Sequence, residues 1–422
     1  MKTYLHFLWR CFRLSFVGDW RYHGWMFFLT VIALLGLNAY CKQFVHGLIT
    51  TGMTDQVSWG MYIANFTFLV GVAAAAVMLV IPVYIYKNKE LHDLVIFGEL
   101  LAVAAIVMCL LFVTVDMGRP DRFLHLFIRP NFPVSMLTWD VIVLNGYLLL
   151  NLHICGYLIY CAYQRRAPSK KFYIPFVFIA IVWAISIHTV TAFLYVGLGG
   201  RPLWNQAIIV PRFIASAFSA GPAIIILTLQ VIDRFTLYHV PRVALLTLRK
   251  LVLVALTINF FLLISELFTE FYTDSQHLAS TQYLYFGLHG NNALVPWIWT
   301  AVVFNMIALI LLSLPLSKSL RFLNVACVLM IVGIWIEKGI GLIIPAFIPT
   351  PLGEIVEYTP TLNETLICLG IWAFGLLVYT IFVRVTIPVL EERLTFGVPY
   401  PPPLETPHIT PTQELIPSGG QP

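Results

Sequence analysis

The chain has 422 residues, of which 59% are hydrophobic and only 11% are charged. Its mean hydropathy is +0.86. A soluble domain of this length needs far more charged surface, so the composition excludes a soluble enzyme and indicates an integral membrane protein. The formal net charge of +5 comes from basic residues in short loops between apolar runs. Such residues set membrane topology, so we expect no binding of nucleic acid.

Ten apolar runs are long enough to cross a bilayer core of about 30 Å as helices. None of them shows the polar and apolar alternation of a membrane strand. The runs cover residues 24–45, 59–86, 93–115, 136–162, 172–198, 208–231, 250–272, 294–314, 321–345 and 363–388. The sequence therefore predicts an all-α integral membrane protein with ten transmembrane helices.

Loop charges predict how these helices are oriented. Most of the 25 Lys and Arg residues fall in the N-terminal segment, in the loops after the second, fourth, sixth and eighth runs, and near the C-terminal end. The positive-inside rule then places both termini in the cytoplasm, and we expect a multi-pass protein of the cytoplasmic membrane. Residues 1–23 are amphipathic and basic without a cleavage pattern, so we expect no cleavable signal. The proline-rich tail after Phe396 predicts an extended cytoplasmic segment.

Two of the predicted outer loops, residues 116–138 and 199–210, carry basic and aromatic residues against the general charge bias. Their basic residues are Arg119, Arg122, Arg129 and Arg201. Loops of this kind either contact lipid headgroups or dock a partner, and both interpretations stay open.

Cysteine and histidine patterns bear on metal and haem cofactors. The seven cysteines show no Cys-x-x-Cys spacing and no haem-attachment motif, so we expect neither a c-type haem nor an iron–sulfur cluster here. A b-type haem usually needs two histidines inside spans, and only His153 and His188 lie well inside apolar runs. Two lone histidines are a weak signal, and we expect no haem and no metal site.

Ionisable side chains inside spans are costly, so each is a candidate functional group. At a rise of 1.5 Å per residue, several spans place polar groups in the outer half of the bilayer. These groups are Tyr62, Asn65, Asp140, Asn145, His188, Glu266, Glu270, Glu337 and Lys338. We expect them to converge at one level beneath the outer face, around a recess wide enough for a ring-shaped molecule.

Several of these residues also have a structural interpretation. Tyr62 could be an interfacial aromatic, and Asn65 could be a hydrogen-bonding contact between helices. Glu337 and Lys338 are adjacent and cannot face each other on a helix, so one could line a pore or partner while the other meets a second ion.

His188 and Glu99 raise the same question on other spans. Ser186, Thr189 and Thr191 surround His188 with hydroxyl groups, which favours a functional histidine over a packing one. Glu99 lies about two turns into the third span from the cytoplasm. It either begins a proton path from the cytoplasm or pairs with a basic loop residue, and both interpretations stay open.

Several segments together resemble a known family of membrane subunits. They are residues 59–65 with 68–71 and 73–76, residues 116–120, 130–133 with 139–140, 186–188, 201–205, and 357–361 with Glu364. In combination they resemble the NrfD/polysulfide reductase membrane-subunit family over roughly residues 59–387. The ten spans and residues 186–188 and 357–364 are most similar to its DsrP branch, the membrane subunit of the Dsr electron-transfer complexes.

The resemblance implies two four-helix bundles with one extra helix at each end. The implied divisions are a cytoplasmic N-terminus (1–23), an extra helix with an outer loop (24–58), a first bundle with a quinone site (59–198), a second bundle (199–345), an outer loop with the tenth helix (346–390) and a cytoplasmic tail (391–422).

The resemblance also implies the function. The protein would be the quinone-reactive subunit of a respiratory oxidoreductase, with menaquinone or another quinone as exchangeable substrate and no activity on the terminal substrate alone. The residues placed at the quinone are Tyr62, Asn65, His188, Arg201, Trp204 and Asn205. The residues placed in catalysis or proton transfer are His188, Glu99, Asp116, Glu266 and Glu337. The polysulfide reductase branch has a histidine near Phe66 and a tyrosine near His188, so this sequence departs from it there.

Partners follow from the same resemblance. A ferredoxin-like iron–sulfur subunit similar to DsrO would dock on the outer face. A multihaem cytochrome c, a b-haem membrane subunit and a cytoplasmic iron–sulfur subunit, similar to DsrJ, DsrM and DsrK, would complete a complex of sulfur or sulfite metabolism in the lipid membrane. Two other classes stay open from the residues: a secondary transporter or ion channel that uses the same intramembrane charges, and a passive anchor.

Overall fold

The computed structural model describes residues 2–273 and 278–397. The predicted proline-rich tail therefore lies almost entirely outside the described residues. All regular elements in the described ranges are helices, and ten of them are long and apolar enough to cross a membrane. The predicted all-α membrane fold with ten transmembrane helices is confirmed.

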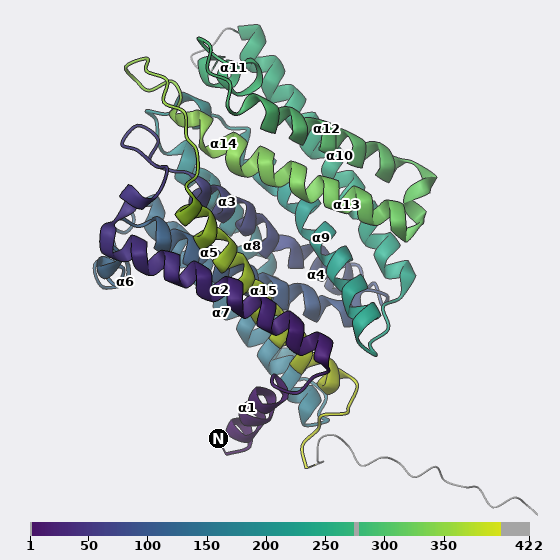
Figure 1. The fold of residues 1–422 in the computed structure, drawn as a ribbon. Helices are drawn as coiled ribbons and strands as arrows, with labels where there is room; N and C mark the ends of the chain where they lie inside the picture. The colour runs from purple at the N-terminus through teal and green to yellow at the C-terminus, as the bar shows by residue number, and fades with distance from the viewer. Residues whose placement is uncertain (1, 274–277, 398–422) are drawn as a thin grey trace, which may run out of the picture.

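The membrane-crossing segments follow the predicted runs to within about four residues, except that α10 begins at Arg242, eight residues before the predicted run 250–272 (Figure 1). They are Trp20–His46 (α2), Met61–Tyr84 (α3, η2 and α4), His92–Asp116 (η3 and α5), Met136–Tyr163 (α7), Lys170–Val196 (α8), Ile209–Phe235 (α9), Arg242–Thr273 (α10), Val295–Ser313 (α12), Leu320–Phe347 (α13, η7, α14 and η8) and Leu362–Leu390 (α15). The helices outside these spans include α1 (Lys2–Leu14), α6 (His125–Ile128), η5 (Pro202–Trp204) and α11 (Leu278–Phe286).

Two spans are interrupted by a change of helix type. The second span is α-helical over Met61–Ala73 (α3) and Val77–Tyr84 (α4), with the 3₁₀ turn η2 at Ala74–Ala76 between them. The ninth is α-helical over Leu320–Ile334 (α13) and then passes into a π-helical turn, η7, at Trp335–Ile340. π-Helical turns are rare and occur frequently at functional sites.

The helices form two packed groups joined along one seam. In the first group α3 packs on α5 and α7 packs on α8; in the second, α9 packs on α10 and α12 packs on α13. Helix α9 also contacts α3 and α8, and η7 contacts α3, so these elements join the groups. Helices α2 and α15 pair with each other, and α15 covers α5 (Figure 1). This is the predicted arrangement of two four-helix bundles with an extra helix at each end of the sequence.

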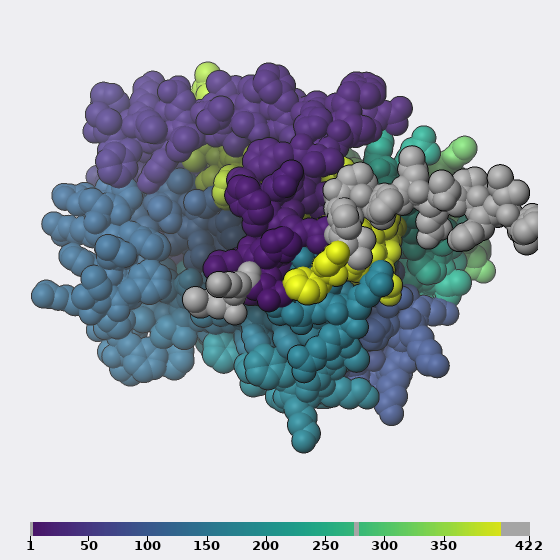
Figure 2. Space-filling model, turned by 90° about the horizontal axis from the view of Figure 1, so that it is seen from below, coloured from purple at the N-terminus to yellow at the C-terminus, as the bar shows by residue number. Residues whose placement is uncertain are grey.

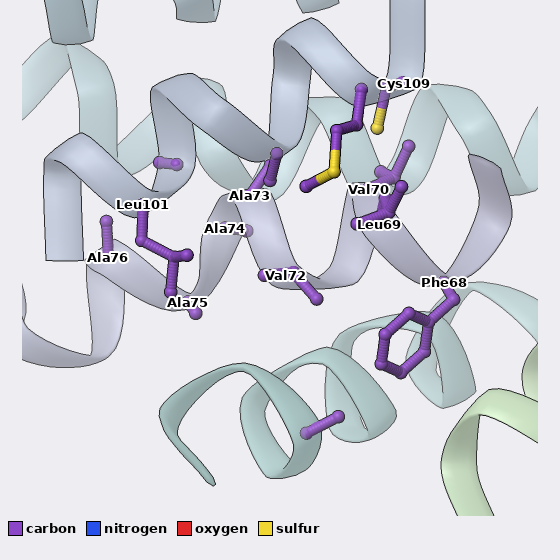
Figure 3. Close-up of a cluster of buried hydrophobic side chains, with 14 of the residues drawn as sticks. Phe68, Leu69, Val70, Val72, Ala73, Ala74, Ala75, Ala76, Leu101 and Cys109 are labelled. Atoms are coloured by element: carbon purple, nitrogen blue, oxygen red, sulfur yellow. The ribbon is translucent and has the colours of Figure 1, made fainter. Parts of the chain in front are cut away.

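Small residues allow the closest helix approaches. Figure 3 shows the alanines of α3 and η2 between neighbouring helices. A Cβ added to Gly221 of α9 would lie 2.2 Å from the Cβ of Ala75. A Cβ added to Gly36 of α2 would lie 2.6 Å from the Cα of Gly370 on α15. Helices in lipid associate by close van der Waals packing, which explains glycine and alanine at these contacts.

Helix α1 marks one end of the molecule. Figure 2 shows it lying across the helix ends beside the segment that follows α15. Arg10 holds it there through a 2.7 Å hydrogen bond to the carbonyl of Thr395, while Leu8, Trp9 and Phe12 are exposed, as in an interfacial amphipathic helix. We call the end that carries α1 the inner end and the end that carries α6 and α11 the outer end, after the predicted orientation.

Candidate functional site

Polar side chains of the outer half gather in three places. The first lies where α3 and α5 meet α2 and α15, and we call it the α15 cluster: Gln43, Tyr62, Asn65, Asp116 and Glu364. The second lies inside the first bundle, and we call it the first-bundle string: Thr67, Asp140, His188, Thr191 and Tyr195. The third, the second-bundle network, comprises Arg212, Asn259, Glu266, Asn305 and Glu337. All of them occupy buried or nearly buried positions.

Tyr62 anchors the α15 cluster. Its hydroxyl donates to Oε1 of Gln43 at 2.6 Å, and Nε2 of Gln43 donates to the carbonyl of Val115 at 2.7 Å. Asp116 follows at the end of α5, and its Oδ1 is buried with no hydrogen-bond partner in the part of the protein that the structure describes. Asp116 and Glu364 both lie within electrostatic range of Tyr62. The cluster therefore holds two carboxyl groups, of which one has an unused acceptor.

Asn65 shares a face of α3 with Tyr62, as the i,i+3 spacing predicts, and this face is turned toward α15 and η7. Its Oδ1 accepts hydrogen bonds from Nε1 of Trp335 at 3.0 Å and of Trp372 at 2.9 Å. Its Nδ2 donates to the carbonyl of Met61 at 2.8 Å. These contacts support the helix-to-helix interpretation of Asn65, because both ends of its amide are already engaged.

Glu364 ties three outer segments together. It is completely buried at the start of α15 and accepts from the backbone N–H of Gly52 at 3.0 Å and of Met61 at 3.3 Å. The hydroxyl of Tyr358 also donates to it. Burial, followed by the neighbouring Glu364 carboxyl, raises the pKa of the Tyr358 phenol, so this group stays a donor.

The first-bundle string begins with two short hydrogen bonds. The hydroxyls of Thr67 on α3 and Tyr195 on α8 are 2.5 Å apart. The hydroxyl of Thr191 donates to Oδ1 of Asp140 on α7 at 2.6 Å. Tyr195 lies within electrostatic range of both Asp140 and Asp116, so the string approaches the α15 cluster at its outer side.

His188 is the buried histidine of the string, with 1% of its surface exposed. Its Nδ1 lies 3.0 Å from the carbonyl of Ala184. Because a carbonyl only accepts, the neutral ring carries its hydrogen on Nδ1 and a lone pair on Nε2. Nε2 is buried and has no partner among residues 2–273 and 278–397. His188 therefore offers an unoccupied base to the interior of the first bundle.

His153 lies at another level of the same bundle. Its Nε2 is 3.5 Å from the carbonyl of Phe172, and its ring packs against Phe176, with 4.5 Å between centroids. Phe172 precedes His188 by about 24 Å along α8 at 1.5 Å per residue. The two histidines are consequently not placed to hold one haem between them.

The second-bundle network is organised by one guanidinium. Arg212 of α9 pairs with Glu266 of α10 and donates to Oε1 of Glu337 on η7 at 2.8 Å. Asn305 of α12 donates to Oε2 of Glu337 at 2.8 Å, and Asn259 donates to its Oε1 at 3.4 Å. Four elements thus meet at one carboxylate, in accordance with the rule that buried charges are paired.

The π-helical turn directs two adjacent charged side chains to different neighbours. Glu337 faces the second bundle, whereas Lys338 lies against Phe213 at the seam. Its Nζ is 3.2 Å from the carbonyl of Phe213 and 4.3 Å from that ring's centroid. It also lies within electrostatic range of His188. The expectation that Glu337 and Lys338 do not face each other is therefore confirmed.

Glu270 extends the second-bundle network toward the outer end. It accepts hydrogen bonds from Gln206 and Thr281. A cavity of about 20 Å³ lies beside Arg212 and Lys338, and one of about 30 Å³ lies beside Glu270. A cavity needs about 10–15 Å³ to hold one water, so these cavities suit one or two waters.

The expected ring-sized recess does not form from these side chains. Tyr62 and Asn65 bond to α2, η7 and α15, whereas His188 bonds within α8. The residues expected in one site therefore lie on opposite sides of α3. Tyr62 and Asn65 face helices that the depth estimate could not place, whereas His188 lies on the side of α8. The cavities beside the network are too small for a ring.

The turn after α8 packs against the end of the ninth span and so connects the two bundles. Trp204 is completely buried, and its Nε1 donates to the carbonyl of Leu342 at 2.9 Å. The guanidinium of Arg201 lies 4.4 Å from the ring centroid of Phe347. Asn205 is exposed. The turn thus lies at the outer end, and its tryptophan is used in packing.

Glu99 lies apart from the other candidates, in the inner half of α5. It is buried and accepts a hydrogen bond from Sγ of Cys155 at 3.3 Å. Within the described ranges it has no ion pair, so the alternative pairing with a loop lysine such as Lys87 or Lys89 is not found. Its carboxyl is available for the other interpretation, a proton-binding group near the inner end.

A family model described as "Polysulphide reductase, NrfD" matches residues 49–348 of this protein. The chain belongs to the NrfD polysulphide reductase family. The matched region contains both bundles but leaves out α1, α2 and α15. Gln43 and Glu364, which complete the α15 cluster, therefore come from helices beyond the family region.

Curated relatives are similar over most of the sequence. A putative dimethyl sulfoxide reductase membrane subunit of Halobacterium salinarum is 25% identical over 84% of this chain and 89% of its own length. An "Hdr-like menaquinol oxidoreductase integral membrane subunit" of Archaeoglobus fulgidus is 23% identical over 86% of this chain and 93% of its own length. A polysulfide reductase component of Wolinella succinogenes is 29% identical over 40% of this chain and 56% of its length. The first two relatives are named as membrane subunits, and the names of all three are those of reductases or oxidoreductases.

Three functional candidates of this NrfD-family protein were missed by the depth argument. Arg212 lies inside the predicted run 208–231, so the same rule that selected Glu266 would have found it. Thr67 and Tyr195 give no such signal, because hydroxyl groups are common in spans and often bond to their own helix. Only their contact across α3 and α8 distinguishes them.

Proposed function

We propose that this NrfD-family protein is the quinone-reactive membrane subunit of a multisubunit oxidoreductase. The observation that carries the proposal is the buried, unpartnered Nε2 of His188 in the outer half of the first bundle, within the part of the protein that the structure describes. The name of the Archaeoglobus relative, a menaquinol oxidoreductase subunit, supports a quinol as the substrate class. Electrons would pass between the quinone pool and an iron–sulfur partner at the outer end.

Quinol oxidation needs acceptors for two protons as two electrons leave. His188 Nε2 supplies one lone pair, and Oδ1 of Asp116 supplies a second buried acceptor without a partner among the described residues. A neutral imidazole with an unpartnered lone pair can accept a proton from a quinol hydroxyl. Tyr195 lies within electrostatic range of Asp116, which makes its hydroxyl a natural contact for a headgroup oxygen.

The headgroup enters by opening the hydrogen bond between Thr67 and Tyr195. This bond joins α3 to α8, and both hydroxyls can donate or accept, so they can rebind a quinone oxygen after they separate. The closed arrangement described above is then the quinone-free state. Tyr62 and Asn65 contribute by holding α3 against α2 and α15.

Protons leave through groups that line water-sized spaces. Glu270, Glu266 and Glu337 connect the outer end to Lys338 at the seam, while Glu99 lies toward the inner end. On this proposal the protein lies in the cytoplasmic membrane with both termini in the cytoplasm, as the loop charges predict.

The finer assignment is to the DsrP branch. It rests on the resemblance of residues 186–188 and 357–364, and it brings DsrO-, DsrJ-, DsrM- and DsrK-like partners and a link to sulfur or sulfite metabolism. The outer loops 116–138 and 199–210 are where the iron–sulfur partner docks on this proposal.

Binding of a fluorescent quinone analogue to the purified full-length protein tests the function. His188→Gln is expected to weaken binding about tenfold, equivalent to about 1.4 kcal/mol, because its amide cannot act as a base with the same geometry. His153→Gln is the matched control and should bind as the native protein does. Equal affinity for His188→Gln, Asp116→Asn and the native protein would remove the proposal.

A second candidate, an ion transporter, is favoured by one observation. The second-bundle network holds Arg212, Glu266 and Glu337 around water-sized cavities, which resembles an intramembrane ion site. Solute or ion flux in vesicles that contain this protein alone, without any electron donor, would decide for transport. The redox proposal predicts flux no greater than that of empty vesicles.

A further inference from the structure

The loop between α5 and α7, where the proposed function docks an iron–sulfur partner, also forms a basic pocket for which that proposal names no ligand. The pocket has a volume of about 380 Å³ and opens at the outer end. Its basic lining residues are Arg119, Arg122, His125 and Arg129. This volume falls in the range of small-molecule sites, about 300–1,000 Å³.

The charges of this pocket are only partly neutralised from within. Arg119 forms two 3.0 Å hydrogen bonds to Asp121, so this pair cancels its own charge. Arg122 and Arg129 are exposed, and their side chains form no hydrogen bond or ion pair within residues 2–273 and 278–397. Asp121 lies within electrostatic range of Arg122, but it is already hydrogen-bonded to Arg119, so the pocket keeps an excess of positive charge. Guanidinium groups bind phosphate oxygens through paired, charge-assisted hydrogen bonds.

The apolar residues beside the pocket place it at the membrane boundary. Helix α6 exposes Phe127 (49%) and Ile128 (69%), and Leu124 before it is 62% exposed. Phe132 and Val134, on the other side of Arg129, are also exposed. A short amphipathic segment of this kind lies in the interface, with its apolar side chains among acyl chains and its basic groups among headgroups.

We propose that this pocket binds the phosphate of an anionic phospholipid from the leaflet at the outer end. Arg122 and Arg129 hold the phosphate, while Phe127 and Ile128 contact the acyl chains. A phospholipid satisfies both halves of the site at once, whereas a free phosphate leaves the apolar side chains unused. The lipid would fix loop 117–135, which connects α5 and α7.

Native mass spectrometry of the full-length protein, with phosphatidylglycerol or phosphatidylcholine added in equal amounts, tests the proposal. We expect one phosphatidylglycerol to bind at least about tenfold more tightly than phosphatidylcholine. Arg122→Gln/Arg129→Gln should abolish this preference. Lys87→Gln/Lys89→Gln, which removes two lysines at the inner end, is the matched control and should retain it.

Phe127→Ser/Ile128→Ser separates a lipid from a free anion. The proposal expects this variant to lose phosphatidylglycerol, and expects inorganic phosphate at the same concentration not to displace the lipid. Retained preference in the double arginine variant would overturn the proposal and would leave the arginines to a protein partner. Displacement of the lipid by a soluble quinone analogue would also overturn it, by assigning the pocket to the quinone.

Discussion

Arg212 and Glu337 join α9 to the π-helical turn of the ninth span through a 2.8 Å hydrogen-bonded ion pair. Their side chains are 15% and 5% exposed, so the pair is shielded from water. The same guanidinium also pairs with Glu266. One cation therefore balances carboxylates from two other elements, and its removal has a larger effect than that of a surface ion pair.

Arg212→Gln is expected to destabilise the protein by about 3–5 kcal/mol, because it leaves two buried carboxylates without a counter-ion. Arg212→Gln/Glu337→Gln should recover part of this loss, since it leaves one carboxylate fewer. Reversible unfolding in mixed detergent measures both. A double variant no more stable than the single would show that Glu337 is not held by Arg212.

Glu364→Gln should loosen the outer loops. The amide keeps the size of the side chain but turns one acceptor into a donor facing N–H groups of Gly52 or Met61. The expected cost is about 1.5–3 kcal/mol, the range for hydrogen bonds to charged groups. Hydrogen exchange should rise in residues 48–61 and 350–361. Glu354→Gln, at an exposed position, should change neither stability nor exchange.

Gly36→Leu should separate α2 from α15, because a side chain there meets the backbone of Gly370. Overpacking of this kind typically costs about 1–3 kcal/mol, and a lower melting temperature measures it. Gly24→Leu changes the same helix where nothing lies within 4 Å of an added Cβ. An equal loss of stability in the two variants would mean that the contact with Gly370 is not responsible, since leucine has a higher helix propensity than glycine at both positions.

Tyr195→Phe isolates the hydroxyl that meets Thr67. Its ring stays packed against Trp204 and Phe213, so we expect a normal melting temperature. Quinone-analogue affinity should fall by about two- to tenfold, equivalent to about 0.5–1.4 kcal/mol for one hydrogen bond. Tyr173→Phe, near the inner end of α8, should bind normally. A drop in melting temperature without a change in affinity would make Tyr195 purely structural.

The ten spans were predictable because each long apolar run must satisfy its backbone hydrogen bonds within a helix. The shared face of Tyr62 and Asn65 followed from their spacing, and so did the divergence of Glu337 from Lys338. The elements that cover that shared face are α2, α15 and η7, which a single-helix argument cannot place. The estimated depth of these residues in the bilayer therefore predicted a single recess, whereas the structure places them on opposite sides of α3.

The packing role of Trp204 was equally hidden from the sequence. An aromatic residue in an outer turn is typical of a ligand site or an interface. Only the hydrogen bond from Trp204 to the carbonyl of Leu342 shows that this residue packs between the bundles. The residue types of Trp335–Ile340 do not distinguish a π-helical turn from an α-helical one, so the sequence does not predict this turn. It packs against α3, and it determines where Lys338 lies.

Photolabelling identifies the residues that contact a bound quinone headgroup. A quinone carrying a photoreactive group on its ring, irradiated with the full-length protein in lipid nanodiscs, marks the residues that touch the headgroup. We expect labelled peptides from the outer halves of α3 and α8, around Thr67, His188 and Tyr195, and weaker labelling in Tyr195→Phe at a subsaturating quinone concentration. Labelling confined to α10, α12 and α13, or spread evenly over lipid-facing residues, would contradict it.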